Sequence, residues 1–478
     1  MSAHRRPLRV VVAAVVLLVS QAVILRAEAA PSVYAGPVPR AKCGPGSLPE
    51  TGRQGRVSQK DVDSGRAGRG YTCNTKLLSR FGDETGGYRV YRYVDSAGHV
   101  CGYYDSTLLF PTDLPEQAAT LTGVYVLDMK DPRRPVKTDN LLTPAMQSPH
   151  ESLSLNYKRG LLAATMGNAL TAPGFFDVYD ISKDCLHPTL LSSTPVAFLG
   201  HEGSFAPDGN TFYAASTAGQ TLVAIDTSNP SAPAPVWELT NVVIHGLNVS
   251  YDGNRVYAAN IGDPGLTIFD TTQIQQRVPN PEVPVITHLT WPEVSIPQTA
   301  IPVTIRGHRY LVEVDEFAGG TTPSAEPTAP VGAARIIDIA NDRKPRVVSN
   351  IRLEVHTQRA RDSDQMNDPG AESSLQGYAG HYCAVPQRRE PGIVACSFIL
   401  SGLRIFDIRD PIRPREIAYY NAPRPGRQAT SYAMSAPAIV PERGEIWYSD
   451  GNLGFYAVKV TNGVWPFRKF RMERSDSL

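Results

Sequence analysis

The sequence lacks a charge excess of either sign and lacks the short motifs of several common enzyme classes. Its 478 residues include 47 Lys+Arg and 46 Asp+Glu. No basic run is interleaved with aromatic residues, so the chain does not have the footprint of a nucleic-acid-binding protein. It also contains no G-x-S-x-G nucleophile elbow and no glycine-rich phosphate loop. These absences exclude nucleic acid as an expected partner and leave little support for a Ser-His-Asp triad.

Long hydrophobic runs are also scarce, and the one at the N-terminus is short for a membrane span. Three arginines precede the apolar stretch at residues 10–19, and an A-x-A sequence follows at residues 27–29. This order predicts a signal peptide over residues 1–29 that is cleaved after export, and it disfavours an uncleaved membrane anchor. We therefore expect a secreted or periplasmic (cell-envelope) protein with no transmembrane span after cleavage.

The chain has only six cysteines and no C-x-x-C pair, so a thiolate metal site is not indicated. In an exported protein the cysteines are expected to form disulfide bonds. Cys383 and Cys396 lie on two strands joined by a turn, so they can face each other across a hairpin. The other four are less constrained, and one arrangement pairs Cys73 with Cys101 and Cys43 with Cys185.

Proline, glycine and tyrosine, by contrast, are abundant, with 40, 39 and 21 residues, as is typical of many short strands joined by turns. One unit repeats along the chain, for example HEGSFAPDGNTFYAAS from His201 and HGLNVSYDGNRVYAAN from His245. Each unit is an apolar run, a turn and a second apolar run, followed by a third strand that ends in aspartate. The aspartates can accept hydrogen bonds from the following turn, and we assign them no chemistry. They are Asp128, Asp180, Asp226, Asp270, Asp338 and Asp407, and Lys459 takes their place in the last unit.

The spacing of these strand ends indicates the architecture. It is 44 to 52 residues in the regular copies and 68 to 69 around Asp338, and a four-stranded antiparallel blade needs about 40–50 residues. The sequence therefore predicts an all-β protein, a seven-bladed β-propeller, with six or eight blades left open. We expect one propeller domain over residues 71–478, long insertions at 319–334 and 358–376, and a flexible arm at 30–70.

The repeated segments resemble a known family. GVYVLDMKDP and GLRIFDIRDP are similar to the repeats of LVIVD-repeat proteins, which are secreted or periplasmic β-propellers. The units quoted above also resemble the hairpins of surface-layer and YncE-like propellers. The resemblance covers residues 120–460 and implies the propeller fold, but it implies no particular activity.

A histidine opens several of the repeat units at the same position. By the resemblance to such propellers, this position begins the innermost strand of each blade, at the mouth of the central channel. Four of the ten histidines fall on six equivalent positions, and equivalent side chains of adjacent blades converge on one axis. The six positions are His150, His201, His245, Gln298, His381 and Ser435.

Two interpretations of this ring compete. In the first, the four histidines bind a transition metal (Fe, Cu or Zn), Gln298 and Ser435 contact a ligand, and Asp315 or Glu313 acts as a catalytic base. The geometry resembles that of carotenoid-cleaving oxygenases, where four histidines hold one metal on a propeller axis. In the second, the histidines form structural hydrogen bonds, as a histidine does in WD-type propellers. Strand alternation turns Glu151 and Glu202 away from the ring, and Glu316 is expected in a solvated loop.

The sequence leaves open whether the protein is an enzyme. If it is, redox, lyase or hydrolase chemistry is expected at the histidine ring, on a small-molecule ligand. The alternative is a non-catalytic module whose faces and long loops bind a surface protein or a glycan. Either protein is expected to be a monomer.

Overall fold

The computed structural model describes residues 36–82, 86–106, 123–165, 174–292, 294–317, 331–368, 377–423, 432–451 and 453–467. The expected signal peptide lies outside the described residues. So do most of the insertion at 319–334 and the end of the insertion at 358–376.

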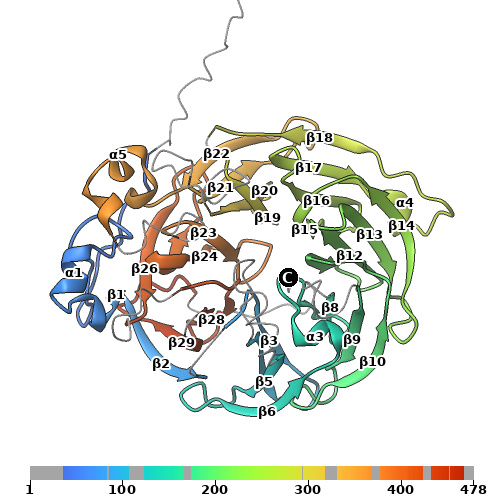
Figure 1. The fold of residues 1–478 in the computed structure, drawn as a ribbon, viewed down its shortest axis with the longest axis horizontal. Coiled ribbons are helices and arrows are strands. Elements are labelled where there is room, and N and C mark those ends of the chain that lie inside the picture. Colours follow the sequence, from blue (N-terminus) through green and yellow to red (C-terminus); the bar gives the residue numbers. More distant parts are fainter. Residues whose placement is uncertain are drawn as a thin grey trace, which may run out of the picture.

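Seven antiparallel sheets surround a central axis, which confirms the predicted seven-bladed β-propeller (Figure 1). Each blade contains four strands in sequential order, apart from the two blades that the N-terminal strands complete. We number the blades 1 to 7 in chain order. From the axis outward, blade 1 contains β3 (Val90–Val94), β4 (Val100–Asp105), β5 (Val124–Asp128) and β6 (Val136–Leu141). Blade 2 contains β7 (Ser154–Asn156), β8 (Leu161–Thr165), β9 (Phe176–Asp180) and β10 (Thr189–Thr194). Blade 3 contains β11 (Glu202–Phe205), β12 (Thr211–Ser216), β13 (Thr221–Asp226) and β14 (Ala234–Thr240), and blade 4 contains β15 (Ile244–Val249), β16 (Arg255–Asn260), β17 (Gly265–Asp270) and β18 (Val285–Leu289).

The remaining blades follow the same order. Blade 5 contains β19 (Ile296–Ile305), β20 (His308–Glu316), β21 (Ala334–Asp338) and β22 (Arg346–Ile351); blade 6 contains β23 (Gly380–Ala384), β24 (Ile393–Phe398), β25 (Gly402–Asp407) and β26 (Arg415–Asn421); blade 7 contains β27 (Ala438–Val440), β28 (Glu445–Asp450) and β29 (Gly454–Val460).

The N-terminal strands close the ring. Strand β2 (Thr75–Phe81) pairs with β29 and so becomes the outermost strand of blade 7. Strand β1 (Tyr71–Cys73) pairs with β26 and adds a fifth strand to blade 6. The first and last parts of the chain therefore share sheets, which leaves no blade open at the junction.

The aspartates that end the third strands cap the turns, as the sequence predicts. In each of six blades the carboxylate accepts a hydrogen bond from the backbone N–H two residues later, at 2.8–3.1 Å. Because each aspartate satisfies a backbone group that the strand leaves unpaired, these residues are structural.

The hydrophobic core lies in the layers between adjacent blades. Between blades 6 and 7, for example, Ile405 and Tyr420 pack with Tyr448 and Val458. All four side chains are at most 3% exposed. Because every blade buries both faces against its neighbours, burial is available only when the ring is complete.

Three disulfide bonds are present, and one of them was predicted from the sequence. Cys383 and Cys396 are paired across β23 and β24 and are joined, as expected. The pairing suggested for the other four cysteines is wrong: Cys43 is joined to Cys73, and Cys101 is joined to Cys185. Cys73 and Cys101 lie in different blades in the folded protein. Cys73 is in β1 at the outer edge of blade 6, whereas Cys101 is in β4 of blade 1.

Residues 36–70, expected as part of a flexible arm, pack against blade 6 and the insertion at 358–376. Helix α1 (Gln59–Asp63) lies beside α5 (Gln358–Arg361) at the rim of the molecule (Figure 1). Arg56 binds Asp368 through two hydrogen bonds of 2.7 and 2.9 Å. Arg56 therefore holds this segment against the insertion at 358–376.

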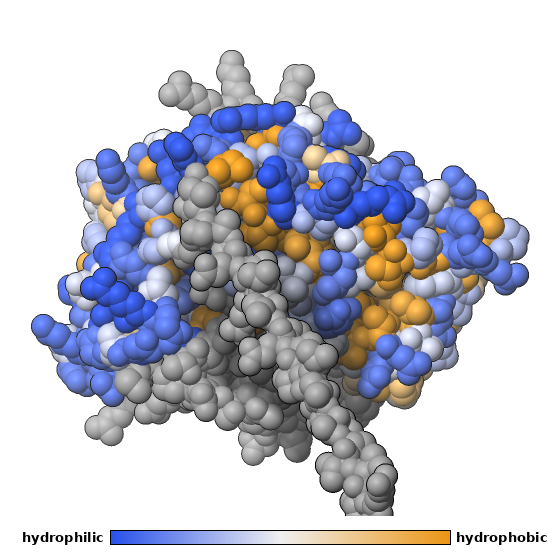
Figure 2. All heavy atoms as spheres, turned by 90° about the horizontal axis from the view of Figure 1, so that it is seen from above, coloured by the Kyte–Doolittle hydropathy of each residue, from blue (hydrophilic) through white to orange (hydrophobic). Residues whose placement is uncertain are grey.

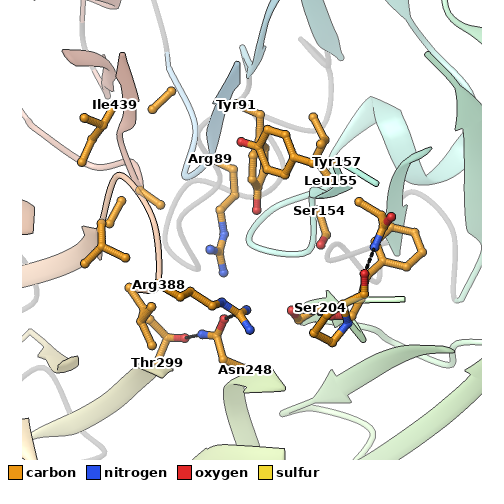
Figure 3. Close-up of a pocket in the computed structure, with 18 of the residues that line it drawn as sticks. Arg89, Tyr91, Ser154, Leu155, Tyr157, Ser204, Asn248, Thr299, Arg388 and Ile439 are labelled. Carbon is orange, nitrogen blue, oxygen red and sulfur yellow. Dashed lines mark hydrogen bonds between the residues drawn. The ribbon is translucent and has the colours of Figure 1, made fainter. Parts of the chain in front are cut away.

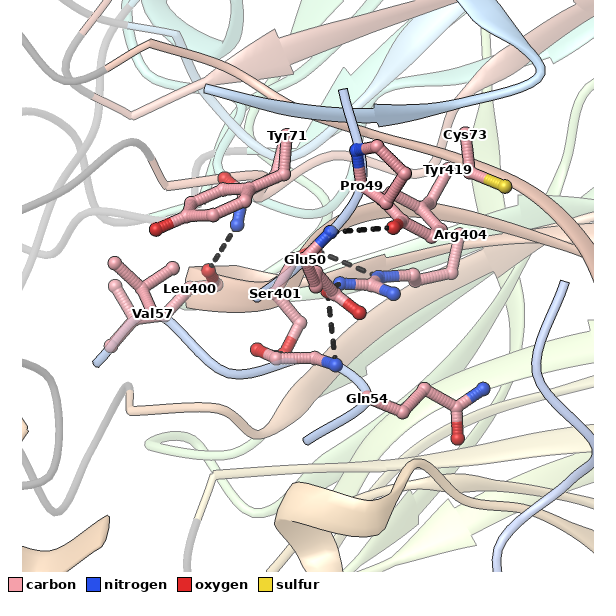
Figure 4. A network of polar contacts seen from close by, with 12 residues as sticks. Pro49, Glu50, Gln54, Val57, Tyr71, Cys73, Leu400, Ser401, Arg404 and Tyr419 are labelled. Atoms are coloured by element: carbon pink, nitrogen blue, oxygen red, sulfur yellow. Dashed lines mark hydrogen bonds and ion pairs between the residues drawn. The ribbon is translucent and has the colours of Figure 1, made fainter. Parts of the chain in front are cut away.

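A buried ionic network fixes the same segment (Figure 4). Arg404 of β25, which is fully buried, contacts Glu50 and donates to Glu416 at 2.9 Å. The Glu50 carboxylate also accepts a hydrogen bond from the backbone N–H of Gly55 at 3.0 Å. The hydroxyl of Tyr419 accepts the backbone N–H of Glu50 at 3.0 Å. Each charge of this network has a partner of opposite sign.

Among the described residues, no helix is both long and apolar enough to cross a membrane. Figure 2 shows one face of the molecule, where hydrophobic residues alternate with hydrophilic ones. Several exposed apolar side chains belong to outer strands, including Leu77 of β2, Val136 of β6 and Val285 of β18.

Candidate functional site on the propeller axis

Three of the six aligned positions lie in β-bulges at the start of an innermost strand. The register of β15 against β16 shifts between Ile244 and Leu247, so His245 has no paired residue on β16. Equivalent shifts leave Gln298 of β19 and His381 of β23 without a paired residue on the neighbouring strand. A bulge places an extra residue on one strand and re-aims its side chain. The repeated bulge therefore turns these side chains out of the regular alternation and toward the axis.

His150 and Glu151 reach the axis by a different route, because both precede β7. His150 has a φ angle of 51°, in the left-handed region that non-glycine residues rarely adopt. Glu151 forms an isolated parallel bridge with Glu202 of blade 3. The alternation expected of a strand does not apply to such a segment, so the expected outward direction of Glu151 is wrong.

The four predicted histidines lie together. The ring centroids of His150 and His201 are 4.6 Å apart, and those of His201 and His245 are 4.8 Å apart. The ring of Tyr88 bridges the remaining gap, at 4.6 Å from His150 and 5.0 Å from His381. Tyr88 precedes β3 and supplies the position for blade 1 that the sequence alignment missed.

Two carboxylates lie within ion-pair distance of three of these histidines, namely His201, His245 and His381. Glu151 Oε2 lies 2.9 Å from His201 Nε2 and 3.3 Å from His245 Nε2, and Glu151 Oε1 lies 3.3 Å from His381 Nε2. Glu316, the last residue of β20, lies 3.5 Å from His245 and 3.0 Å from His381 through its carboxylate oxygens. Glu316 is 5% exposed, so the expectation of a solvated loop residue is wrong. We call these six residues the axial cluster: His150, Glu151, His201, His245, Glu316 and His381.

Hydrogen bonds to the backbone fix the orientation of two imidazoles. His245 Nδ1 lies 2.9 Å from the carbonyl oxygen of Pro297, and His381 Nδ1 lies 2.5 Å from that of Met434. A carbonyl oxygen only accepts, so Nδ1 carries the proton in both residues. Their Nε2 atoms therefore point at the carboxylates and, in the neutral imidazole, present a lone pair there.

The charges within the axial cluster are strongly coupled. Burial opposes the protonation of His245, but the nearby carboxylates of Glu316 and Glu151 outweigh burial and raise its pKa to about 10. The same balance raises the pKa of His381 to about 9. Burial and the neighbouring His201 lower the pKa of His150 to about 3. The pKa of Glu151 lies well below its usual value, since the attraction of His201 and His245 exceeds the effect of burial.

A second polar layer lies next to the axial cluster. Arg89 donates from Nε to the carbonyl oxygen of Glu151 at 3.0 Å and pairs with the carboxylate of Glu202 at 3.0 Å. The Tyr382 hydroxyl donates to Glu202 at 2.8 Å and accepts a hydrogen bond from the side-chain amide of Gln298. Glu202 of blade 3 thus connects blade 1 through Arg89 with blade 6 through Tyr382.

The absence of a side chain at Gly246 leaves room for the carboxylate of Glu202. A Cβ atom on Gly246 would stand 2.2 Å from a carboxylate oxygen of Glu202 and 2.3 Å from the carbonyl oxygen of Gln298. Any side chain at this position would displace the carboxylate or the backbone of blade 5. Glycine is therefore required for this close approach.

The remaining predicted site residues have other contacts. Glu313 and Asp315 both pair with the buried Arg335, and Asp315 also accepts from the indole N–H of Trp291 at 3.1 Å. The Ser435 hydroxyl accepts the backbone N–H of Ser449 at 2.8 Å. The structure brings the four histidines together, and the carboxylate that joins them from β20 is Glu316.

Sequence reasoning missed Tyr88, Arg89, Glu151 and Glu316 as members of this region. A signal for Glu151 was present, because an acidic residue directly follows the histidine in two repeat units. No comparable signal marks Tyr88, because its blade shares only the strand that ends in aspartate with the other repeat units.

Comparisons with known proteins assign no family and no function to the chain. No protein-family model matches the chain, and no curated protein matches it significantly. The resemblance to LVIVD-repeat proteins therefore stays a prediction. Similar solved structures include the Cps50 (Swd1) β-propeller domain of Myceliophteria thermophila, with 11% identity, a TM-score of 0.49, and coverage of 81% of this chain and 100% of that one.

Two further structures have comparable similarity. One is a putative 6-phosphogluconolactonase of Bacteroides uniformis, with 12% identity, a TM-score of 0.45, and coverage of 77% of this chain and 89% of that chain. The other is hydrazine synthase of Kuenenia stuttgartiensis, with 12% identity, a TM-score of 0.44, and coverage of 77% and 93%. These names describe those two proteins and not this chain.

Proposed function

We propose that the axial cluster binds one divalent transition metal (Fe, Cu or Zn) on the propeller axis. The observation that carries the proposal is the fixed direction of the imidazole Nε2 atoms of His245 and His381 toward two buried carboxylates. A hydrogen bond from Nδ1 to a backbone carbonyl is the usual support of a metal-binding histidine. Mixed imidazole and carboxylate donors suit these metals.

The charge of the axial cluster supports the same proposal. Glu151 and Glu316 are each at most 5% exposed, and their carboxylates form ion pairs with histidines. The two negative charges need two positive charges, which either two protons or one divalent cation can supply. The raised pKa values of His245 and His381 indicate that these residues hold the two protons when no metal is bound.

Export is the second part of the proposal. Three disulfide bonds fit an oxidising compartment, and the N-terminal residues 1–29 have the order of a signal peptide. We therefore infer a secreted or cell-envelope propeller of the LVIVD-repeat type that carries a metal.

Metal binding should release protons from the axial cluster. Histidines that form only structural hydrogen bonds would bind no metal and release no protons, so the proton count distinguishes the two interpretations. Tag-free protein, treated with a chelator and titrated with Zn²⁺ by calorimetry at pH 7.5, should bind about one equivalent and release about two protons. The proton count comes from titrations in buffers of different ionisation enthalpy. It is expected because His245 and His381, with pKa values of about 10 and about 9, are protonated in the metal-free protein.

Variants test which residues hold the metal. Glu151→Gln and Glu316→Gln should each weaken Zn²⁺ binding at least about tenfold. His308→Gln is the matched control, because His308 pairs with Asp338 in blade 5 and has no contact with the axial cluster. Less than about a tenth of an equivalent of bound metal, or equal affinity in all three variants, would contradict the proposal.

A further inference from the structure

A second site lies on the same axis, on the other side of the Arg89–Glu202 layer from the axial cluster. A cavity of about 300 Å³ is lined there by residues of the innermost strands and the turns that follow them (Figure 3). Arg89 and Glu202 form part of its wall. The guanidinium groups of Arg89 and Arg388 extend toward the same space. Arg92 and Lys158 also line the cavity, and none of its lining residues is a histidine.

Arg388 is buried without a negatively charged partner. It is 5% exposed, and it donates from Nη1 to the carbonyl oxygen of Val249 at 2.7 Å and from Nη2 to Asn248 Oδ1 at 3.5 Å. Its Nε has no hydrogen-bond partner. Among the described residues, none has a carboxylate within ion-pair distance of Arg388. Burial lowers its pKa, as is expected for a charge that lacks compensation.

The acidic residues of the cavity wall are already engaged. Glu202 is neutralised by Arg89 at 3.0 Å and accepts hydrogen bonds from Tyr382. Asp208 accepts hydrogen bonds from the side-chain amide of Gln275 at 2.7 Å and from the backbone N–H of Asn210 at 2.9 Å. Four cationic residues, Arg89, Arg92, Lys158 and Arg388, outnumber the two acidic ones in the cavity wall, so its lining carries a net positive charge. An unpaired buried charge is costly, and a bound anion would remove that cost.

We propose that this cavity binds a small organic carboxylate, whose carboxylate group pairs with Arg388 and whose body lies against tyrosine rings. Tyr91, Tyr157 and Tyr251 all line the cavity. A planar guanidinium fork matches the two oxygens of a carboxylate. The volume is at the lower end of the range for small-molecule sites, so it suits a ligand of one ring or of similar size.

Benzoate is the probe for this proposal, with benzamide as its uncharged counterpart and inorganic phosphate as the alternative anion. Calorimetric titrations of the full chain in the presence of EDTA should show benzoate binding, with benzamide and phosphate at least about tenfold weaker. EDTA makes the result independent of any metal in the axial cluster. Arg388→Gln should weaken benzoate binding at least about tenfold. Arg134→Gln is the control and should bind as the wild type does, because Arg134 lies at the exposed edge of blade 1 with its side chain 85% exposed.

Equal binding of benzoate and benzamide would overturn the proposal, as would phosphate binding more tightly than benzoate. Unchanged benzoate affinity in a folded Arg388→Gln protein would also overturn it. Arg388 joins two blades through Val249, so the variant must first give the wild-type circular dichroism spectrum. If it does not fold, the wild-type comparison of benzoate with benzamide decides the matter alone.

Discussion

At the scale of single residues, histidines of one chain are driven to opposite charge states by their neighbours. His245 and His381 face carboxylates and have raised pKa values, whereas His356 is buried without a carboxylate partner. His356 Nε2 lies 2.6 Å from the carbonyl oxygen of Tyr378, and His356 Nδ1 accepts the backbone N–H of Leu353 at 3.0 Å. Both ring nitrogens are therefore satisfied only in the neutral imidazole.

Acid should destabilise the protein through His356. Burial lowers its pKa from 6.5 to about 3, so its contribution to stability is complete above pH 6.5 and is lost as the pH falls from there toward 3. At pH 5 the loss relative to pH 8 should be about 2 kcal/mol. Thermal unfolding of wild-type and His356→Gln proteins at pH 8 and pH 5 measures it. The wild type should lose more stability between the two pH values than the variant does, and equal losses would mean that His356 is not buried in its neutral form.

At the scale of structural elements, regular strands follow the sequence pattern and the bulges do not. The strands that end in aspartate are where the spacing places them. The bulges at His245, Gln298 and His381 decide which side chains face the axis, and alternation alone gives no sign of them. The docking of residues 36–70 also cannot be predicted from local sequence, because Glu50 and its partner Arg404 are 354 residues apart.

The docking of this segment should depend on Glu50. Glu50→Gln removes one of the two carboxylates that compensate the buried Arg404, and we expect a loss of about 1.5–3 kcal/mol in the docking of the segment. Limited proteolysis should then cleave within residues 36–70 sooner than in the wild type. The matched control is Arg53→Gln, because Arg53 pairs with Asp364, whose side chain is 67% exposed, and such pairs contribute about 0–1 kcal/mol. Equal cleavage rates in the two variants would show that the network does not hold the segment.

At the scale of the whole molecule, the ring is closed by strands from opposite ends of the chain. Strand β2 covers the outer edge of β29, with pairs from Thr75 opposite Val460 to Phe81 opposite Phe455. Without β2, blade 7 would have three strands and an exposed edge.

Two truncations test the closure. A chain that starts at residue 71, with Cys73→Ser, keeps β1 and β2 and should remain folded and monomeric. A chain that starts at residue 82 loses both strands and should aggregate or unfold, because blade 7 no longer completes the ring. Size-exclusion chromatography and the cooperativity of thermal unfolding distinguish the two results. A monomeric, cooperatively unfolding chain from residue 82 would show that β2 is dispensable.

The sequence predicted the all-β class, the capping aspartates, the convergence of His150, His201, His245 and His381, and the bond between Cys383 and Cys396. It favoured seven blades but left six or eight open, and the structure contains seven. These features recur in successive repeat units or depend on residues that are close in sequence, so the sequence pattern is enough to predict them. The tertiary structure alone decided the other two disulfide bonds, the docking of residues 36–70, and the carboxylates of the axial cluster. Glu151 and Glu316 come from blades 2 and 5, at the end of an irregular segment and of a strand, and they meet only because ring closure brings distant blades to one axis. Partners that depend on closure leave no periodic trace in the sequence, since the contacts join residues whose separation along the chain is not fixed by the repeat.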